Sequence, residues 1–229
     1  MNRSCALLSN GTAAISTLAN TTEPAVELVA AACLVFRGTG RIGEGLEYLD
    51  KALAVARTGS ILEGNLIEER GHLLRAGARL PSALRAYEEA LGIWVRQPRP
   101  DREAVCHLRI GDVLRLMGSY DEAAEHYQLG FRLHEELGEN PLARGDALEC
   151  LADVARVTGD WDRAITLYTD AQQTFRSVPD GLVGLTNTAH SLGEPGWRCP
   201  TSTVPGSTTT RPCGSASGSV TGRGRPMPS

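Results

Sequence analysis

Small and apolar side chains recur along this chain in blocks with helical spacing. Within each block, apolar residues fall three or four positions apart, which is the spacing of one face of an α-helix. Residues 111–138 and 152–175 share one order: a small residue, an apolar stripe, a glycine, an aromatic residue, an alanine, a tyrosine and another small residue. Residues 71–94 form a third copy and residues 33–56 a weaker fourth. The pattern predicts pairs of helices joined by short turns.

The copies follow one another at a nearly constant interval. The small residue early in the second predicted helix is Gly45, Ala83, Ala123 and Ala164, so the intervals are 38, 40 and 41 residues. A fixed period of this length with helical spacing inside each copy indicates stacked helical hairpins. We therefore expect an all-α solenoid of antiparallel hairpins.

A small residue, a bulky residue and a second small residue mark each second helix. Ala123, Tyr127 and Gly130 lie on one helical face, where the small residues let a partner helix approach and the tyrosine fills the space between hairpins. Corresponding sets are Gly45, Leu49 and Ala52, then Ala83, Tyr87 and Ala90, then Ala164, Tyr168 and Ala171. Gly118 and Gly159 are expected to end first helices. Pro141 and Pro179 fall between copies, where a helix must stop.

These residues resemble the tetratricopeptide repeat family, in its bacterial variant of roughly forty residues per repeat. The resemblance covers roughly 26–193. It implies a right-handed superhelical solenoid whose first helices line a concave groove that binds a protein or peptide partner, with no catalytic activity. The array also resembles the sensor regions of large bacterial regulators. The alternative function is therefore the sensor arm of a transcriptional regulator with a nucleotide-switch domain.

The repeats divide the chain into three parts. Residues 25–193 are expected to form about four hairpins plus an unpaired helix, since 181–193 looks like the first helix of a fifth hairpin. Residues 1–24 are expected to be a poorly ordered segment or a partial helix. Residues 194–229 hold six each of Gly, Pro, Ser and Thr, which predicts disorder. Two interpretations of this tail remain open: a natural disordered tail, or out-of-frame translation.

Composition argues against several kinds of partner and site. A net charge of −4 gives no basic face for nucleic acid, and no apolar run is long enough to span a membrane. The six cysteines have neither zinc-site nor disulfide-framework spacing, which favours the reducing cytoplasm. Scattered histidines form no HExxH motif. We therefore expect no membrane contact and no metal.

One short motif invites a different interpretation. Residues 38–43 match GxGxxG, but they fall between two predicted helices, whereas a dinucleotide site requires a strand before the loop. A hairpin turn is the favoured interpretation. Lys51 lies in no P-loop, so neither a cofactor nor a catalytic residue is expected.

An arginine recurs four residues after the small residue of each first helix. Stacked copies would place these arginines as a ladder in the concave groove, where their planar guanidinium groups suit carboxylates. The competing and favoured interpretation is ordinary helix-surface ion pairing, since Asp112 and Asp153 lie three residues before two of them. With Asp146 also in the groove, both signs of charge are expected there. The candidate peptide-groove residues are Arg37, Glu68, His72, Arg75, Asp112, Arg115, Glu149, Asp153 and Arg156.

Overall fold

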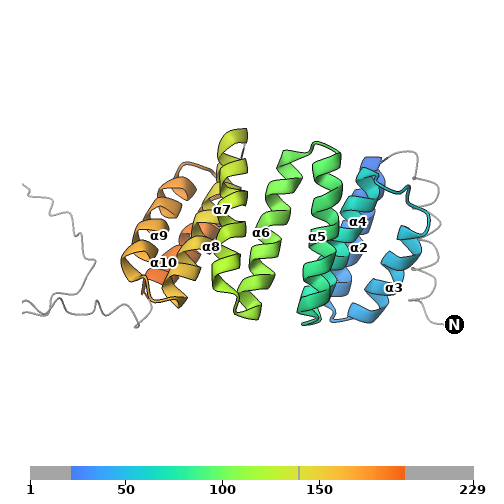
Figure 1. The fold of residues 1–229 in the computed structure, drawn as a ribbon, viewed down its shortest axis with the longest axis horizontal. Helices are drawn as coiled ribbons and strands as arrows, with labels where there is room; N and C mark the ends of the chain where they lie inside the picture. Colours follow the sequence, from blue (N-terminus) through green and yellow to red (C-terminus); the bar gives the residue numbers. More distant parts are fainter. Residues whose placement is uncertain (1–21, 139, 194–229) are drawn as a thin grey trace, which may run out of the picture.

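The computed structural model describes residues 22–138 and 140–193, and this part of the chain forms nine helices (Figure 1). They are α2 (Thr22–Gly38), α3 (Ile42–Leu53), α4 (Ile61–Ala76), α5 (Leu80–Arg96), α6 (Pro100–Met117), α7 (Tyr120–Leu137), α8 (Pro141–Val157), α9 (Trp161–Arg176) and α10 (Leu182–Gly193). The expected disorder of residues 194–229 lies outside the described residues, as does most of the segment 1–24.

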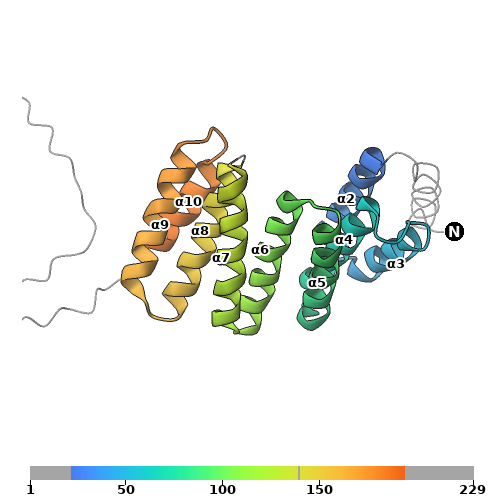
Figure 2. The same cartoon turned by 45° about the horizontal axis from the view of Figure 1, so that its top comes forward.

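Consecutive helices pack as antiparallel hairpins that stack side by side along one axis (Figures 1 and 2). The hairpins are α2–α3, α4–α5, α6–α7 and α8–α9, and α10 follows against α9 and α8. Each second helix also packs on the first helix of the next hairpin. The predicted all-α solenoid of helical hairpins is thus confirmed.

The turn inside each hairpin contains one residue with a left-handed backbone. Gly40, Ala78, Gly118 and Gly159 have φ values of 69°, 56°, 85° and 85°. Glycine adopts this conformation without steric strain, which is why it ends helices so often. The GxGxxG stretch is therefore the turn between α2 and α3, as the favoured interpretation held.

The small–bulky–small sets of the second helices lie in the core, as their spacing predicts. Tyr87, Tyr127 and Tyr168 are fully buried, each packed on the first helix of its own hairpin. A Cβ added at Gly71 or Gly111 would lie 2.6 or 2.7 Å from the nearest tyrosine ring atom. The tyrosine ring thus occupies the space that a side chain would need on the first helix.

The first helices lie on the inner side of the array. Contacts join α2 to α4, α6 to α8 and α8 to α10, whereas neighbouring second helices lie apart, separated by first helices. An array whose first helices are closest together curves around them. The first helices therefore line one concave surface, and all of the candidate groove residues lie on these helices.

Candidate functional site

The concave surface is built around a contact that repeats in three hairpins. A tyrosine from the second helix reaches a polar residue on the first helix, next to the small residue beneath its ring. Tyr127 Oη donates to Asp112 Oδ1 at 3.0 Å, and Tyr168 Oη donates to Asp153. In the α4–α5 hairpin, Tyr87 Oη lies 2.8 Å from His72 Nδ1. These predicted groove residues thus anchor their own hairpins.

In the α4–α5 hairpin, His72 can take the place of the aspartate because its imidazole is neutral. Burial, together with four nearby guanidinium groups led by Arg109, lowers the pKa of His72 to about 3. The Nδ1 atom of a neutral imidazole can accept a hydrogen bond from the Tyr87 hydroxyl, as a carboxylate oxygen does in the other hairpins. The three hairpins therefore make one type of hydrogen bond with two acceptor chemistries.

The four ladder arginines occupy equivalent positions, but protein groups already engage them. Arg37 lies 3.4 Å from Glu69 on the next first helix. Arg75 and Arg115 interact with the hydroxyls of Tyr87 and Tyr127. Arg156 pairs with Asp153 at 3.5 Å and reaches the Tyr168 hydroxyl at 3.4 Å.

The ion pairs only partly follow the spacing seen in the sequence. Asp153 pairs with Arg156 three residues later, as the competing interpretation anticipated. Asp112 instead pairs with Arg109 on the other side, at 3.5 Å. Arg109 has a side chain 40% exposed and lies at the centre of the surface. It is more accessible than Arg37 and Arg102, whose side chains are 28% and 31% exposed.

Glu68 differs from the other predicted groove residues because it is only 4% exposed. Trp94 Nε1 and Cys106 Sγ each donate to Glu68 Oε1 at 3.0 Å, and Arg102 pairs with the other oxygen. The Arg102 guanidinium also lies over the Trp94 ring, 5.3 Å from its centre. This carboxylate therefore joins α4, α5 and α6, with its oxygens already occupied by protein donors.

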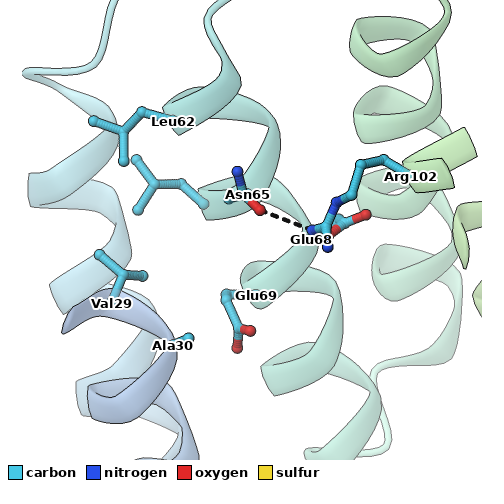
Figure 3. Close-up of a pocket in the computed structure, with 8 residues that line it drawn as sticks. Val29, Ala30, Leu62, Asn65, Glu68, Glu69 and Arg102 are labelled. Atoms are coloured by element: carbon cyan, nitrogen blue, oxygen red, sulfur yellow. Dashed lines mark hydrogen bonds and ion pairs between the residues drawn. The ribbon is translucent and has the colours of Figure 1, made fainter. Parts of the chain in front are cut away.

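A cavity of about 140 Å³ opens beside this joint, between α2, α4 and α6 (Figure 3). Its apolar lining is Val29, Ala30, Leu62 and Leu66. Its polar rim is Asn65, Glu69 and Arg102, where Arg102 donates to Asn65 Oδ1 at 2.7 Å. The cavity thus has an apolar wall and an internally paired polar edge.

The α8 part of the surface is acidic. Asp146, Glu149 and Asp153 lie one helical turn apart on one face of α8. Burial raises the pKa of Glu149 to about 7, with further contributions from Asp153 and Asp146. Burial also raises the pKa of Asp146. A cation beside these carboxylates would lower their pKa values.

Sequence reasoning missed the residues that connect different hairpins. Arg102 and Glu68 are 34 positions apart, and Trp94 and Glu68 are 26 apart, so no helical spacing links them. Arg102 also has no counterpart in the repeat pattern. A buried carboxylate opposite a tryptophan and an arginine from neighbouring helices becomes visible only once the stacking order is fixed.

The described residues also limit which other chemistries are present. Within residues 22–138 and 140–193, no helix is long and apolar enough to cross a membrane. In the same part of the chain, no three His, Cys, Asp or Glu side chains are grouped to hold a metal ion.

Sequence comparisons identify relatives of only part of the chain. The chain is 31% identical over 125 residues to the protein O-mannosyl-transferase Tmtc1 of Drosophila melanogaster, covering 48% of this chain and 14% of that protein. It is 34% identical over 82 residues to the photosystem I assembly protein Ycf3 of Prochlorococcus marinus, covering 36% and 45%. The chain thus spans less than half the length of either relative.

Solved structures share the fold over most of the chain. BtubC from P. vanneervenii has a TM-score of 0.67 and 15% identity, covering 83% of this chain and 84% of that one. A Rap protein complexed with Competence and Sporulation Factor has a TM-score of 0.62 and 15% identity, covering 73% and 52%. A signal transduction ATPase with a tetratricopeptide repeat sensor from Pyrococcus horikoshii has a TM-score of 0.61 and 15% identity. The match covers 73% of this chain and 25% of that one.

The family comparison matches the centre of the array directly. Residues 62–136, which hold α4 to α7, match the tetratricopeptide repeat family. The hairpins on either side continue the same stacking and the same buried small–bulky–small sets. The hairpins α4–α5 and α6–α7 thus match tetratricopeptide repeats, and the hairpins beside them share the fold.

Proposed function

We propose that the concave surface binds an extended peptide segment of a protein partner and that the chain acts as a scaffold or adaptor without catalysis. The observation that carries the proposal is the surface formed by α4, α6 and α8, which combines exposed charges of both signs with a cavity. Tetratricopeptide repeats generally bind proteins, and the Rap protein of the same fold was solved with a peptide factor bound. The free thiols of Cys33, Cys106 and Cys150 suit a partner in the cytoplasm.

The charges of the surface favour a protein segment over nucleic acid. Arg109 at its centre is flanked by Asp112 and lies near Asp146. A phosphate backbone would meet these carboxylates as well as the arginines, and like charges repel. A peptide can place either sign where it is needed.

Charge reversal at the centre of the surface tests the proposal. A displayed library of random linear peptides is selected on the full chain, and the dissociation constants of enriched peptides are measured. Arg109→Glu should weaken binding by about tenfold, since one charge pair lost on a partly exposed surface is worth about 1.4 kcal/mol. Arg85→Glu, an exposed site on α5, is the matched control. Equal effects of the two variants, or no enriched peptides, would reject the proposal.

A second candidate function follows from one comparison. The ATPase with a tetratricopeptide repeat sensor contains this fold as a quarter of its length. Our array would then be the sensor arm of a regulator with a nucleotide-switch domain. Sequencing the coding region on both sides tests this: a P-loop motif in the same reading frame would support it, and its absence on both sides would exclude it.

A further inference from the structure

Two features of the concave surface lie at the same level along the first helices. One is the cavity between α2 and α4, and the other is the pair Asp146 and Glu149 on α8. We infer that the bound segment places an uncharged aliphatic side chain in the cavity and, about six residues away, a lysine or arginine against Asp146 and Glu149. This inference rests on the proposed function and specifies the chemistry of its ligand.

The cavity suits a small apolar group, such as an aliphatic side chain, by its size and its charge. Its volume of about 140 Å³ is close to that of an engineered apolar cavity that accommodates benzene. One leucine, isoleucine, valine or methionine side chain therefore fits, a phenyl ring fits as well, and an indole is too large. The charges at the rim already neutralise one another, since Glu69 pairs with Arg37 and Glu68 with Arg102. The rim thus offers no unpaired charge to attract a charged side chain.

The two α8 carboxylates differ from their neighbours because, in the described part of the chain, no protein group hydrogen-bonds to them, and only the guanidinium of Arg109 lies near Asp146. Asp112 and Asp153 each accept a tyrosine hydroxyl and pair with an arginine. The side chains of Asp146 and Glu149 form neither a hydrogen bond nor an ion pair with any other residue that the structure describes. Asp146 is exposed and Glu149 half-buried, so a ligand can reach both. A cationic side chain placed here relieves the repulsion among these carboxylates.

The spacing follows from the stacking of the first helices. Asn65 and Glu69 lie early in α4, as Asp146 and Glu149 do in α8, so the two features face each other across α6. Arg102 connects α6 to Asn65 of α4, and α6 packs on α8, so at about 10 Å per step the two features lie about 20 Å apart. An extended chain covers about 3.3 Å per residue, so about six residues span this distance.

Selection with two separate groove variants tests the inference. The library of random linear peptides is selected on the full chain, on Ala30→Phe, which fills the cavity, and on the double variant Asp146→Asn with Glu149→Gln. Peptides from the unaltered chain should share an aliphatic residue and a basic residue about six positions apart. Ala30→Phe should remove only the aliphatic preference, and the double variant only the basic one. Each should weaken an enriched peptide by about tenfold.

Controls separate the inference from the proposed function. Glu125→Gln on the exposed face of α7 should change neither preference, and Ala30→Leu repeats the cavity test with a smaller group if Ala30→Phe lowers the helix content. Peptides that depend on Arg109 but lack the paired motif would overturn the inference and leave the proposed function standing. The same holds if the motif appears but neither groove variant alters it. A library that yields no binder would overturn both.

Discussion

Tyr127 Oη donates a hydrogen bond to Asp112 Oδ1, 3.0 Å away, across the hairpin formed by α6 and α7. The tyrosine is fully buried and its ring covers Gly111. The same arrangement joins Tyr168 to Asp153 and, with a neutral imidazole as acceptor, Tyr87 to His72. A face expected to serve ligands thus also contributes the polar contacts that close each hairpin.

Removing the hydroxyl should destabilise the hairpin while keeping its packing. Tyr127→Phe retains the ring and leaves Asp112 with Arg109 alone, so we expect a loss of about 1 kcal/mol in the free energy of unfolding. Urea denaturation followed by circular dichroism measures it. Tyr120→Phe, at a half-buried tyrosine that begins α7, is the control and should change stability by less. Equal losses would show that the Asp112 contact is not stabilising.

The glycine beneath the ring should be intolerant of a methyl group. Gly111→Ala puts a Cβ 2.7 Å from the Tyr127 ring, which should cost about 1–3 kcal/mol of stability through overpacking. Gly43→Ala in α3 meets no atom within 4 Å and should stabilise the helix by about 0.5–1 kcal/mol. Thermal unfolding of both variants checks the pair. The two variants should change the free energy of unfolding in opposite directions, and changes in the same direction would contradict the packing around Gly111.

The turn between α4 and α5 carries a strained residue. Ala78 has a φ of 56°, at the position where the other three hairpins have glycine. Ala78→Gly should therefore raise the free energy of unfolding by about 1 kcal/mol, because glycine adopts the left-handed region without a Cβ clash. Gly118→Ala should do the reverse. Denaturation midpoints of the two variants measure this, and a destabilising Ala78→Gly would refute the assigned backbone conformation.

The buried carboxylate between hairpins should be among the most sensitive sites in the array. Glu68→Ala leaves Trp94 Nε1 without its acceptor and Arg102 without its carboxylate, and breaking a buried ion pair in this way costs about 3–5 kcal/mol. Glu68→Gln keeps an acceptor and should lose less. Glu89→Ala, at an exposed site on α5, serves as the control in chemical denaturation. If Glu68→Ala lowers the free energy of unfolding no more than Glu89→Ala, the contact of Glu68 with Trp94 and Arg102 does not stabilise the array.

Stability should fall as the pH rises through the range where Glu149 ionises. Its pKa is about 7 in the folded chain, against an ordinary glutamate value of 4.5, so the folded state holds more protons than the unfolded state between these values. The other charges near it, Asp153 and Asp146, are also acidic. Because the side chain is partly exposed, we expect a loss of about 1 kcal/mol between pH 5 and pH 8. In Glu149→Gln this part of the pH dependence should vanish, whereas in Glu125→Gln it should persist.

Local spacing was sufficient to predict the fold, because each repeat forms from residues close in sequence. The interval between Gly45, Ala83, Ala123 and Ala164 set the stacking, and all four are buried. The arginines were placed at equivalent positions, but their partners were only partly foreseen. Asp112 pairs with Arg109 and accepts the Tyr127 hydroxyl, whereas Arg115 interacts with that hydroxyl. A tyrosine fifteen residues from Asp112 is invisible to helical periodicity. The contacts of Glu68 with Trp94 and Arg102 were missed for the same reason.

The separation of neighbouring second helices has a mechanical meaning. Since most neighbouring first helices are in contact and the second helices are held apart, bending the array changes the outer gaps more than the inner contacts. The solenoid then bends about its inner edge. Small rotations at each hairpin add up over the stack, so the inner surface can tighten around a segment or open to release it without breaking any single hairpin.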